Sequence, residues 1–526
     1  MWGVVALGIF LRLFHFFDNR SLWIDEIYLS TGILRFDFVS LATEQLDYEQ
    51  KAPIGFLWLV KLSVLAFGTG EKALRLVPLL TGMAALVLFV PVARAFLKPL
   101  GVVMALTLLA TAPPLVYHAV EIKQYSTELC VTVLALYLYV RFEGRFDAAS
   151  LVWWGLSGAL LIWFSFTSVF ILAGMGGGVS LYYLVRKEWR QLFRAVVPFS
   201  MWAVSFAANY YFFTSRHEDS DWLLHWFRLR DGFMPFGLSV VGKVSWVLQC
   251  LYRMFIYPLN VLWNAELLEN VDNKALKVFL KMPFFILFFA AVGLYRFSRK
   301  NPKLLFVLVL PLLLTLAATS IEKYPFYERL LTFLAPLSIL YLAHGCEQTI
   351  SKLRRTVWRY ALVVVLVGWP VICSAQQALN PDLFWDYKKS YYREALLYLN
   401  EHYRPGDAVY VYWNFKPAYR YYQQAYGLKP AAKELSDVRM VSASPQDYVN
   451  RLRPEFADTA GVKRIWFVYE RFLRLEIGDY DFQPVWYLKP GVQGGAVLRR
   501  EFDKIGTEVK TYTKSNVGVS LYEVGK

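Results

Sequence analysis

Apolar runs of about 15–20 residues recur along residues 1–380 and are separated by short polar loops. A membrane-spanning helix needs about 20 apolar residues, so the pattern predicts a polytopic α-helical membrane protein with about eleven spans. We take the first run as a retained helix, because it lacks the basic start and the cleavage site of a signal peptide. The predicted ranges are 2–17, 75–93, 100–117, 126–140, 150–164, 166–185, 195–213, 281–296, 303–319, 329–346 and 360–378.

The apolar run 53–67 is not counted as a span, because Lys61 lies near its centre and a lysine at that depth costs about 2.5–3.5 kcal/mol. We expect this run to lie in the outer interface as an amphipathic helix. Counting it as a span would move the basic loops to the outer face, against the rule that such loops face the cytoplasm. Those loops are 94–98, 141–145, 186–194, 296–303 and 352–359.

This topology predicts a cytoplasmic N-terminus and places the loops 18–51 and 215–281 on the outer face. The outer loop 215–281 contains a polar cluster at 217–222 and an apolar stretch, 240–263, that we expect to lie on the surface of the membrane domain.

The pattern changes after residue 380, where helical and strand-like segments alternate. Helices are expected at 391–403 and 417–425, and strands at 408–413, 464–469 and 519–524. This alternation is typical of a small α/β domain. We therefore expect a transmembrane domain at 1–380 and a C-terminal extracytoplasmic α/β domain at 381–526.

Composition agrees with a membrane protein. The chain is 57% hydrophobic and 18% charged, against about 25% charged residues in soluble domains, and its mean hydropathy is +0.36. The net charge of +15 would fit a nucleic-acid partner. However, many basic residues lie in short loops between apolar runs, and the positive-inside rule for cytoplasmic loops explains this placement. We expect membrane lipids and no nucleic acid as partners. The four cysteines show no paired spacing.

The segment Ser21–Tyr28, just past the first apolar run, carries the adjacent carboxylates Asp25 and Glu26 beside Trp23. An acidic pair can simply mark the first turn of a helix. A membrane enzyme that deprotonates a hydroxyl next to a lipid-borne substrate also needs such a pair. We favour the second interpretation and include Tyr28 in the candidate cavity.

Cationic side chains mark the other outer loops. Lys51 could bind a lipid phosphate, or it could be a lysine that reaches from the helix to the interface. Arg75 and Arg329 each lie at the start of a predicted span, where an arginine either anchors the interface or binds phosphate.

Residues 117–125 form a polar stretch between two apolar runs, and it contains His118, Glu121, Lys123 and Tyr125. Such groups are costly at a membrane hairpin unless they face water or one another, so a solvated turn is the alternative. His118 and Glu121 could bind a metal, although a pair of ligands is weak support. Tyr327 belongs to the outer loop before Arg329. All of these groups can meet at one outer cavity.

These motifs, in this order, resemble the C-type glycosyltransferases, and among them the bacterial relatives of dolichyl-phosphate-mannose protein mannosyltransferases. The resemblance covers about residues 1–380. It is carried by 23–26, 51–53, 67–78, 121–125 and 328–329, with 23–26 the most specific. Many relatives have Pro-Pro or Lys-Pro where this chain has Lys51-Ala52-Pro53, and many have arginine where it has Lys123. These departures leave the sugar and the acceptor open.

The resemblance implies a polyprenyl-phosphate-linked sugar donor and a lipid, glycan or protein acceptor. The compact chain without large insertions between the spans suggests a bacterial inner membrane. The resemblance makes Asp25 the expected general base, with Glu26 orienting it or binding acceptor, and Lys51, Lys123, Arg329 and Arg75 the expected phosphate ligands. Hexosyl or pentosyl transfer with inversion is expected. No cofactor is obligatory, and a divalent metal is compatible. The alternatives are transfer from a lipid diphosphate, and a lipid-linked sugar flippase, which would favour inverted repeats.

Overall fold

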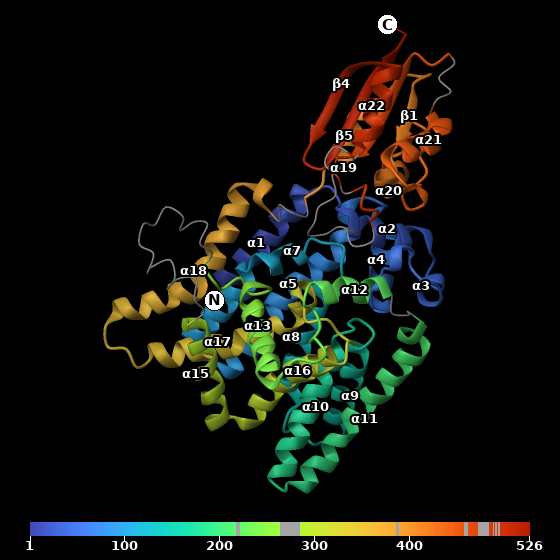
Figure 1. Ribbon diagram of the computed structural model, residues 1–526. Helices are drawn as coiled ribbons and strands as arrows, with labels where there is room; N and C mark the ends of the chain where they lie inside the picture. The colour runs from blue at the N-terminus through green and yellow to red at the C-terminus, as the bar shows by residue number, and fades with distance from the viewer. Residues whose placement is uncertain are drawn as a thin grey trace. The chain divides into compact units, whose positions relative to one another are not determined.

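The computed structural model describes residues 1–216, 221–263, 284–384, 389–456, 461–471, 483–487, 489, 492 and 495–525 (Figure 1). Of the predicted outer loop 215–281, the parts 217–220 and 264–281 lie outside the described residues. The chain divides into two compact units. The membrane unit comprises Met1–Asp18, Phe36–Ala66 and Lys72–Phe384, and the α/β unit comprises Asn19–Arg35, Phe67–Glu71 and Trp385–Lys526.

The membrane unit is built from helices. They are α1 (Trp2–Asp18), α3 (Ser40–Thr43), α4 (Ile54–Phe67), α5 (Glu71–Phe96), α6 (Pro99–Thr111), α7 (Pro113–His118), α8 (Tyr125–Phe142), α9 (Ala148–Leu161), α10 (Ser168–Val185), α11 (Trp189–Phe212), α12 (Asp221–Leu229), α13 (Val240–Ile256), α15 (Phe284–Lys300), α16 (Pro302–Ser320), the 3₁₀ helix η4 (Glu328–Leu334), α17 (Ala335–Ile350) and α18 (Thr356–Leu379).

Six helical segments in the described part of the chain are long and apolar enough to cross a membrane. They are α5, α10, α11, α16, η4 with α17, and α18. The multi-pass membrane fold is therefore confirmed, whereas the predicted count of about eleven spans is not. The shorter apolar helices include α4, α6 and α9.

The predicted span 100–117 is divided into two helices. The residue before a proline disfavours the helical conformation, and Ala112, which precedes Pro113, is extended with φ −62° and ψ 116°. As a result, α6 ends at Thr111 and α7 begins at Pro113.

Arg12 explains how the end of α6 is stabilised inside the membrane unit. Pro113 and Pro114 have no amide hydrogen, so the carbonyls of Leu109 and Ala110 lose the donors four residues ahead of them. The fully buried Arg12 guanidinium donates to these carbonyls at 3.1 and 3.2 Å. The charge that interrupts the first apolar run thus replaces two missing helical hydrogen bonds.

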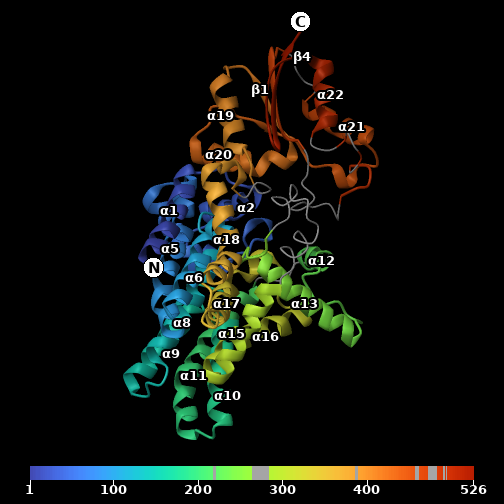
Figure 2. The same ribbon diagram turned by 90° about the vertical axis from the view of Figure 1, so that its left-hand side faces the viewer.

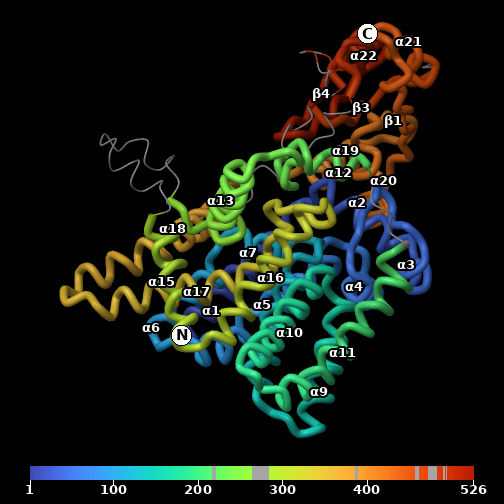
Figure 3. The backbone as a smooth tube through the Cα atoms, turned by 60° about the horizontal axis from the view of Figure 1, so that its bottom comes forward, coloured from blue at the N-terminus to red at the C-terminus, as the bar shows by residue number. Residues whose placement is uncertain are grey.

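Two helix pairs in the membrane unit, α10 with α16 and α15 with α17, pack along much of their length (Figure 3). Gly293 of α15 and Gly345 of α17 lie where the two backbones touch. A Cβ on Gly293 would collide with the Tyr341 carbonyl, and one on Gly345 with that of Phe289. Small residues allow this close approach, as is common between membrane helices.

The α/β unit contains a five-stranded sheet of order β2-β1-β3-β5-β4. The strands are β1 (Ala408–Val411), β2 (Lys433–Glu434), β3 (Arg464–Glu470), β4 (Gly506–Lys514) and β5 (Val517–Val524). The first three are parallel, and β5 and β4 add antiparallel pairs. The helices of this unit are α2 (Ile24–Arg35), α19 (Tyr392–His402), α20 (Lys416–Tyr426), α21 (Pro445–Phe456) and α22 (Ala496–Ile505).

The strands β1, β3 and β5 are buried on both faces, whereas β4 is largely exposed. Along β3, Phe467 packs with Phe502 of α22, whereas its neighbour Trp466 meets Tyr398 of α19. Successive side chains of a strand point to opposite faces, so α19 covers one face and α21 and α22 the other (Figure 2). The predicted small α/β fold is confirmed, with β2, β4, α21 and α22 as additions to the predicted elements.

Candidate functional site

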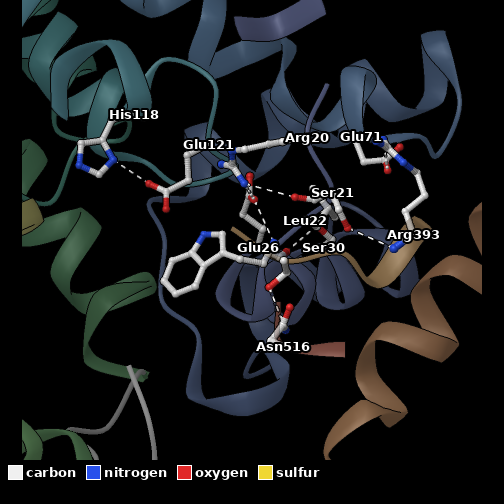
Figure 4. Close-up of polar contacts among 12 residues, drawn as sticks. Arg20, Ser21, Leu22, Glu26, Ser30, Glu71, His118, Glu121, Arg393 and Asn516 are labelled. Carbon is white, nitrogen blue, oxygen red and sulfur yellow. Dashed lines mark hydrogen bonds and ion pairs between the residues drawn. The ribbon is translucent and has the colours of Figure 1, made fainter. Parts of the chain in front are cut away.

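The N-terminus of α2 gives Glu26 a structural function. The Trp23 carbonyl accepts the Glu26 amide at 3.0 Å, and the Glu26 carboxylate accepts the Trp23 amide at 3.3 Å. This is the acidic half of a capping box. The same carboxylate pairs with Arg20 at 2.8 Å, and the side chains of Arg20 and Glu26 are 4% and 0% exposed (Figure 4). Glu26 is therefore held as part of a buried ion pair.

Asp25 differs from its neighbour Glu26, because Asp25 is only half-buried whereas Glu26 is buried. It lies in the first turn of α2, where the helix dipole stabilises a negative charge. Trp23 is buried and Tyr28 is half-buried on the same segment. Of the two predicted carboxylates, Asp25 is the less buried.

The segment before α2 is held by helices of the α/β unit. The phenol oxygen of Tyr422 in α20 accepts the Leu22 amide at 2.9 Å and lies 3.0 Å from Ser21 Oγ. Ser21 Oγ also accepts the backbone amide of Arg393 in α19 at 3.2 Å. The position of Asp25 thus depends on residues about 400 positions away in the chain.

A second contact network fixes the segment Phe67–Glu71 in the same unit. Arg393 Nη1 pairs with the buried Glu71 carboxylate at 3.0 Å, and the Tyr426 phenol donates to it at 2.7 Å. Burial and the Glu71 carboxylate raise the pKa of Tyr426 to about 12. Burial alone would lower the pKa of Arg393, but Glu71 and Glu394 hold it above its ordinary value.

His118 and Glu121 meet inside the membrane unit. His118 Nδ1 lies 2.6 Å from Glu121 Oε2, and its Nε2 is hydrogen-bonded to the Tyr257 phenol. Both side chains are buried. Residues 117–125 are all buried, so a solvated turn does not describe this stretch. Both ring nitrogens of His118 are engaged by protein groups in this arrangement.

Cations lie near this pair in the same unit. The ring of Tyr125 is 4.9 Å from that of His118, and the Arg329 guanidinium lies 5.9 Å from the Tyr125 ring. The buried Lys123 ammonium is hydrogen-bonded to the side-chain oxygen of Gln50, the residue before the half-buried Lys51. The structure therefore joins His118, Glu121, Tyr125 and Arg329 in one series of contacts.

The two remaining predicted residues, Arg75 and Tyr327, also belong to the membrane unit. Arg75 is buried in α5, with 2% of its surface exposed. The ring of Tyr327 packs against Trp226 and Phe227 of α12. Burial and the neighbouring Glu328 raise the pKa of Tyr327 to about 12.

Sequence reasoning missed the partners that hold these groups. Arg20 precedes Glu26 by six residues, outside the spacing of a capping box, and Tyr422 and Tyr257 are far from their partners in sequence. Within the described ranges, no group of three or more His, Cys, Asp or Glu side chains has a metal-binding arrangement. The pair His118 and Glu121 accordingly gives no separate argument for a metal.

The fold is similar to that of a solved glycosyltransferase, in agreement with the resemblance given above. No protein-family model matches the sequence, and a search of curated proteins finds no match. ArnT from Cupriavidus metallidurans, in a crystal structure with undecaprenyl phosphate, is similar in structure over 98% of this chain and 97% of its own, with a TM-score of 0.50 and 14% identity.

Lower-scoring similarity extends to two structures from Archaeoglobus fulgidus. An oligosaccharyltransferase complex with Zn and sulfate is matched over 88% of this chain and 67% of its own, with a TM-score of 0.46 and 14% identity. The oligosaccharyltransferase AglB, with an inhibitory peptide and a dolichol phosphate, is matched over 89% and 69%, with a TM-score of 0.45 and 13% identity. At these identities the similarity concerns the fold alone, because one fold can host several functions.

Proposed function

We propose that the protein is a glycosyltransferase that moves a sugar from a polyprenyl-phosphate donor to a lipid, glycan or protein acceptor on the outer face of a bacterial inner membrane. The observation that carries this proposal is the fold shared with ArnT, whose structure holds undecaprenyl phosphate. A shared fold supports this function by analogy. The division of roles between Asp25 and Glu26 gives it a specific chemical form.

The proposed reaction is a single displacement. The acceptor hydroxyl oxygen attacks the anomeric carbon, and its proton passes to the Asp25 carboxylate acting as general base. The bond from the anomeric carbon to the phosphate oxygen breaks, and the lipid phosphate leaves with the electron pair. The configuration at the anomeric carbon is inverted. Support for Asp25 as the base comes from its half-buried position beside the fully engaged Glu26.

The leaving phosphate needs charge stabilisation more than it needs a proton. We assign this function to Lys51, Lys123 and Arg329, since ammonium and guanidinium groups form strong charge-assisted hydrogen bonds with phosphate. Arg329 is half-buried, and the buried Lys123 ammonium is hydrogen-bonded to the side-chain oxygen of Gln50. Arg75, which lies deeper in α5, has a less direct role in this proposal.

The test is mass spectrometry of lipid A, core oligosaccharide, surface polysaccharide and secreted proteins from a strain that lacks the protein. The proposal expects one sugar to disappear from one of these acceptors and to return with the wild-type chain. An accumulated diphosphate-linked oligosaccharide would favour the lipid-diphosphate alternative. Unchanged glycans together with a lipid-linked sugar trapped in the inner leaflet would favour a flippase and contradict the proposal.

A further inference from the structure

A groove of about 550 Å³ lies in the membrane unit between the first turn of α1 and the second halves of α5 and α8. Its walls are mainly apolar and include Val87, Leu88 and Pro91 of α5. Trp2 and Tyr137 contribute an aromatic side chain each. The volume falls within the range of about 300–1,000 Å³ that is common for small-molecule sites.

The walls of the groove face outward from the helices. The side chains of Trp2 and Val87 are 57% and 43% exposed. Because α5 is long and apolar enough to cross the membrane, its exposed apolar side chains meet acyl chains in the bilayer. A groove with such walls suits a hydrocarbon chain lying along the helix.

Arg94 adds a positive charge to this apolar surface. It lies in the last turn of α5, lines the groove and is exposed. No hydrogen bond or ion pair of its guanidinium is found among the residues that the structure describes. An arginine offers paired N–H donors to a phosphate. Tryptophan and tyrosine favour the level of lipid headgroups, so Trp2 and Tyr137 are suited to flank such a phosphate.

We propose that this groove binds one anionic phospholipid of the surrounding bilayer, with an acyl chain along Val87 and Leu88 and the phosphate on Arg94. Basic pockets between membrane helices are known to take anionic headgroups. The ligand is a structural lipid, so this binding is independent of the proposed glycosyl transfer.

Native mass spectrometry of the purified full-length chain, titrated with dioleoyl-phosphatidylglycerol or with dioleoyl-phosphatidylethanolamine, tests the proposal. The wild type is expected to retain one phosphatidylglycerol more tightly than phosphatidylethanolamine. Arg94→Gln should weaken that binding about tenfold, as loss of a charge-assisted contact does. Ala95→Trp, which fills the groove from its own wall, should weaken binding of both lipids.

Matched controls come from α11, where Arg194 and Ala203 are also exposed. Arg194→Gln and Ala203→Trp should bind phosphatidylglycerol like the wild type. Unchanged binding in both groove variants would overturn the proposal, as would equal retention of the two lipids by the wild type. Displacement of phosphatidylglycerol by equimolar undecaprenyl phosphate would assign the groove to the donor lipid, and a dimer mass without bound lipid would assign it to a second copy of the chain.

Discussion

Removal of the Glu26 carboxylate should loosen helix α2 without touching the proposed base. In Glu26→Ala, the charge of Arg20 stays in a site where its side chain is 4% exposed and loses its partner at 2.8 Å. Breaking a buried ion pair from one side costs about 3–5 kcal/mol. The amide of Trp23 also loses its acceptor at 3.3 Å.

Hydrogen exchange measured on the full chain in lipid nanodiscs reports this loss locally. An opening free energy lower by about 3 kcal/mol makes amide exchange in α2 about 100-fold faster or more. Glu44→Ala is the control, because Glu44 is an exposed carboxylate of the membrane unit. It should leave exchange in α2 unchanged.

A double variant separates the effect of the unbalanced charge from the effect of lost side-chain packing. Replacing both partners, as Arg20→Met with Glu26→Leu, removes the uncompensated charge and should restore most of the protection of α2. The reasoning is refuted if Glu26→Ala alone keeps exchange in α2 within threefold of wild type. It is also refuted if exchange in α2 is faster in the double variant than in Glu26→Ala.

Three further predictions follow from the same contacts. Tyr422→Phe leaves the buried Leu22 amide without its acceptor, which costs about 1–3 kcal/mol, so exchange at residues 19–23 should accelerate at least fivefold. Lys51→Ala should weaken binding of undecaprenyl phosphate to the purified protein about tenfold. The pKa of Tyr426 in the folded protein is raised to about 12 from an ordinary value of about 10. Its contribution to stability is therefore complete below pH 10 and is lost as the pH rises through 12. The midpoint of thermal unfolding should fall over this pH range, and Tyr426→Phe should make the fall smaller.

Each of these predictions has a matched comparison. Tyr403→Phe removes the phenol oxygen of a half-buried tyrosine in the same unit, and Lys352→Ala removes an exposed lysine of the membrane unit. Both should behave like the wild type. Exchange at residues 19–23 as slow in Tyr422→Phe as in the wild type would contradict the contact of Tyr422 with the Leu22 amide. Wild-type affinity for undecaprenyl phosphate in Lys51→Ala would contradict the phosphate-binding role of Lys51. A thermal midpoint that stays constant from pH 9 to 12 would contradict the assignment for Tyr426.

The class of fold could be predicted from the sequence because its signals are local. Apolar runs define membrane helices over ranges of about 20 residues, and the change of pattern after residue 380 indicates the small sheet domain. The break at Ala112 had a local signal as well, in Pro113 and Pro114. The predicted span count is not confirmed, since helices such as α9 at Ala148–Leu161 are shorter than a full crossing.

The candidate site was harder to predict, because its supports are distant in sequence. The segment around Ser21 is held by Tyr422, and Glu71 is held by Arg393. No periodicity connects these positions. The different environments of Asp25 and Glu26 also depend on Arg20, whose distance from Glu26 matches no capping pattern. The acidic pair was thus predictable from the sequence, whereas the buried ion pair of Glu26 and the half-buried position of Asp25 became visible only in the structure.

The most direct test compares Asp25→Asn with Asp37→Asn in vesicles that contain the purified protein, the polyprenyl-phosphate-sugar fraction of the host membrane and its glycan acceptors. Asp37 is an exposed carboxylate that accepts the Ser40 amide at 2.7 Å, and asparagine also serves as a helix cap. The account predicts that Asp25→Asn transfers sugar about 100-fold more slowly or worse, with exchange in α2 unchanged, and that Asp37→Asn transfers at the wild-type rate. Transfer by Asp25→Asn within threefold of wild type would contradict the central claim.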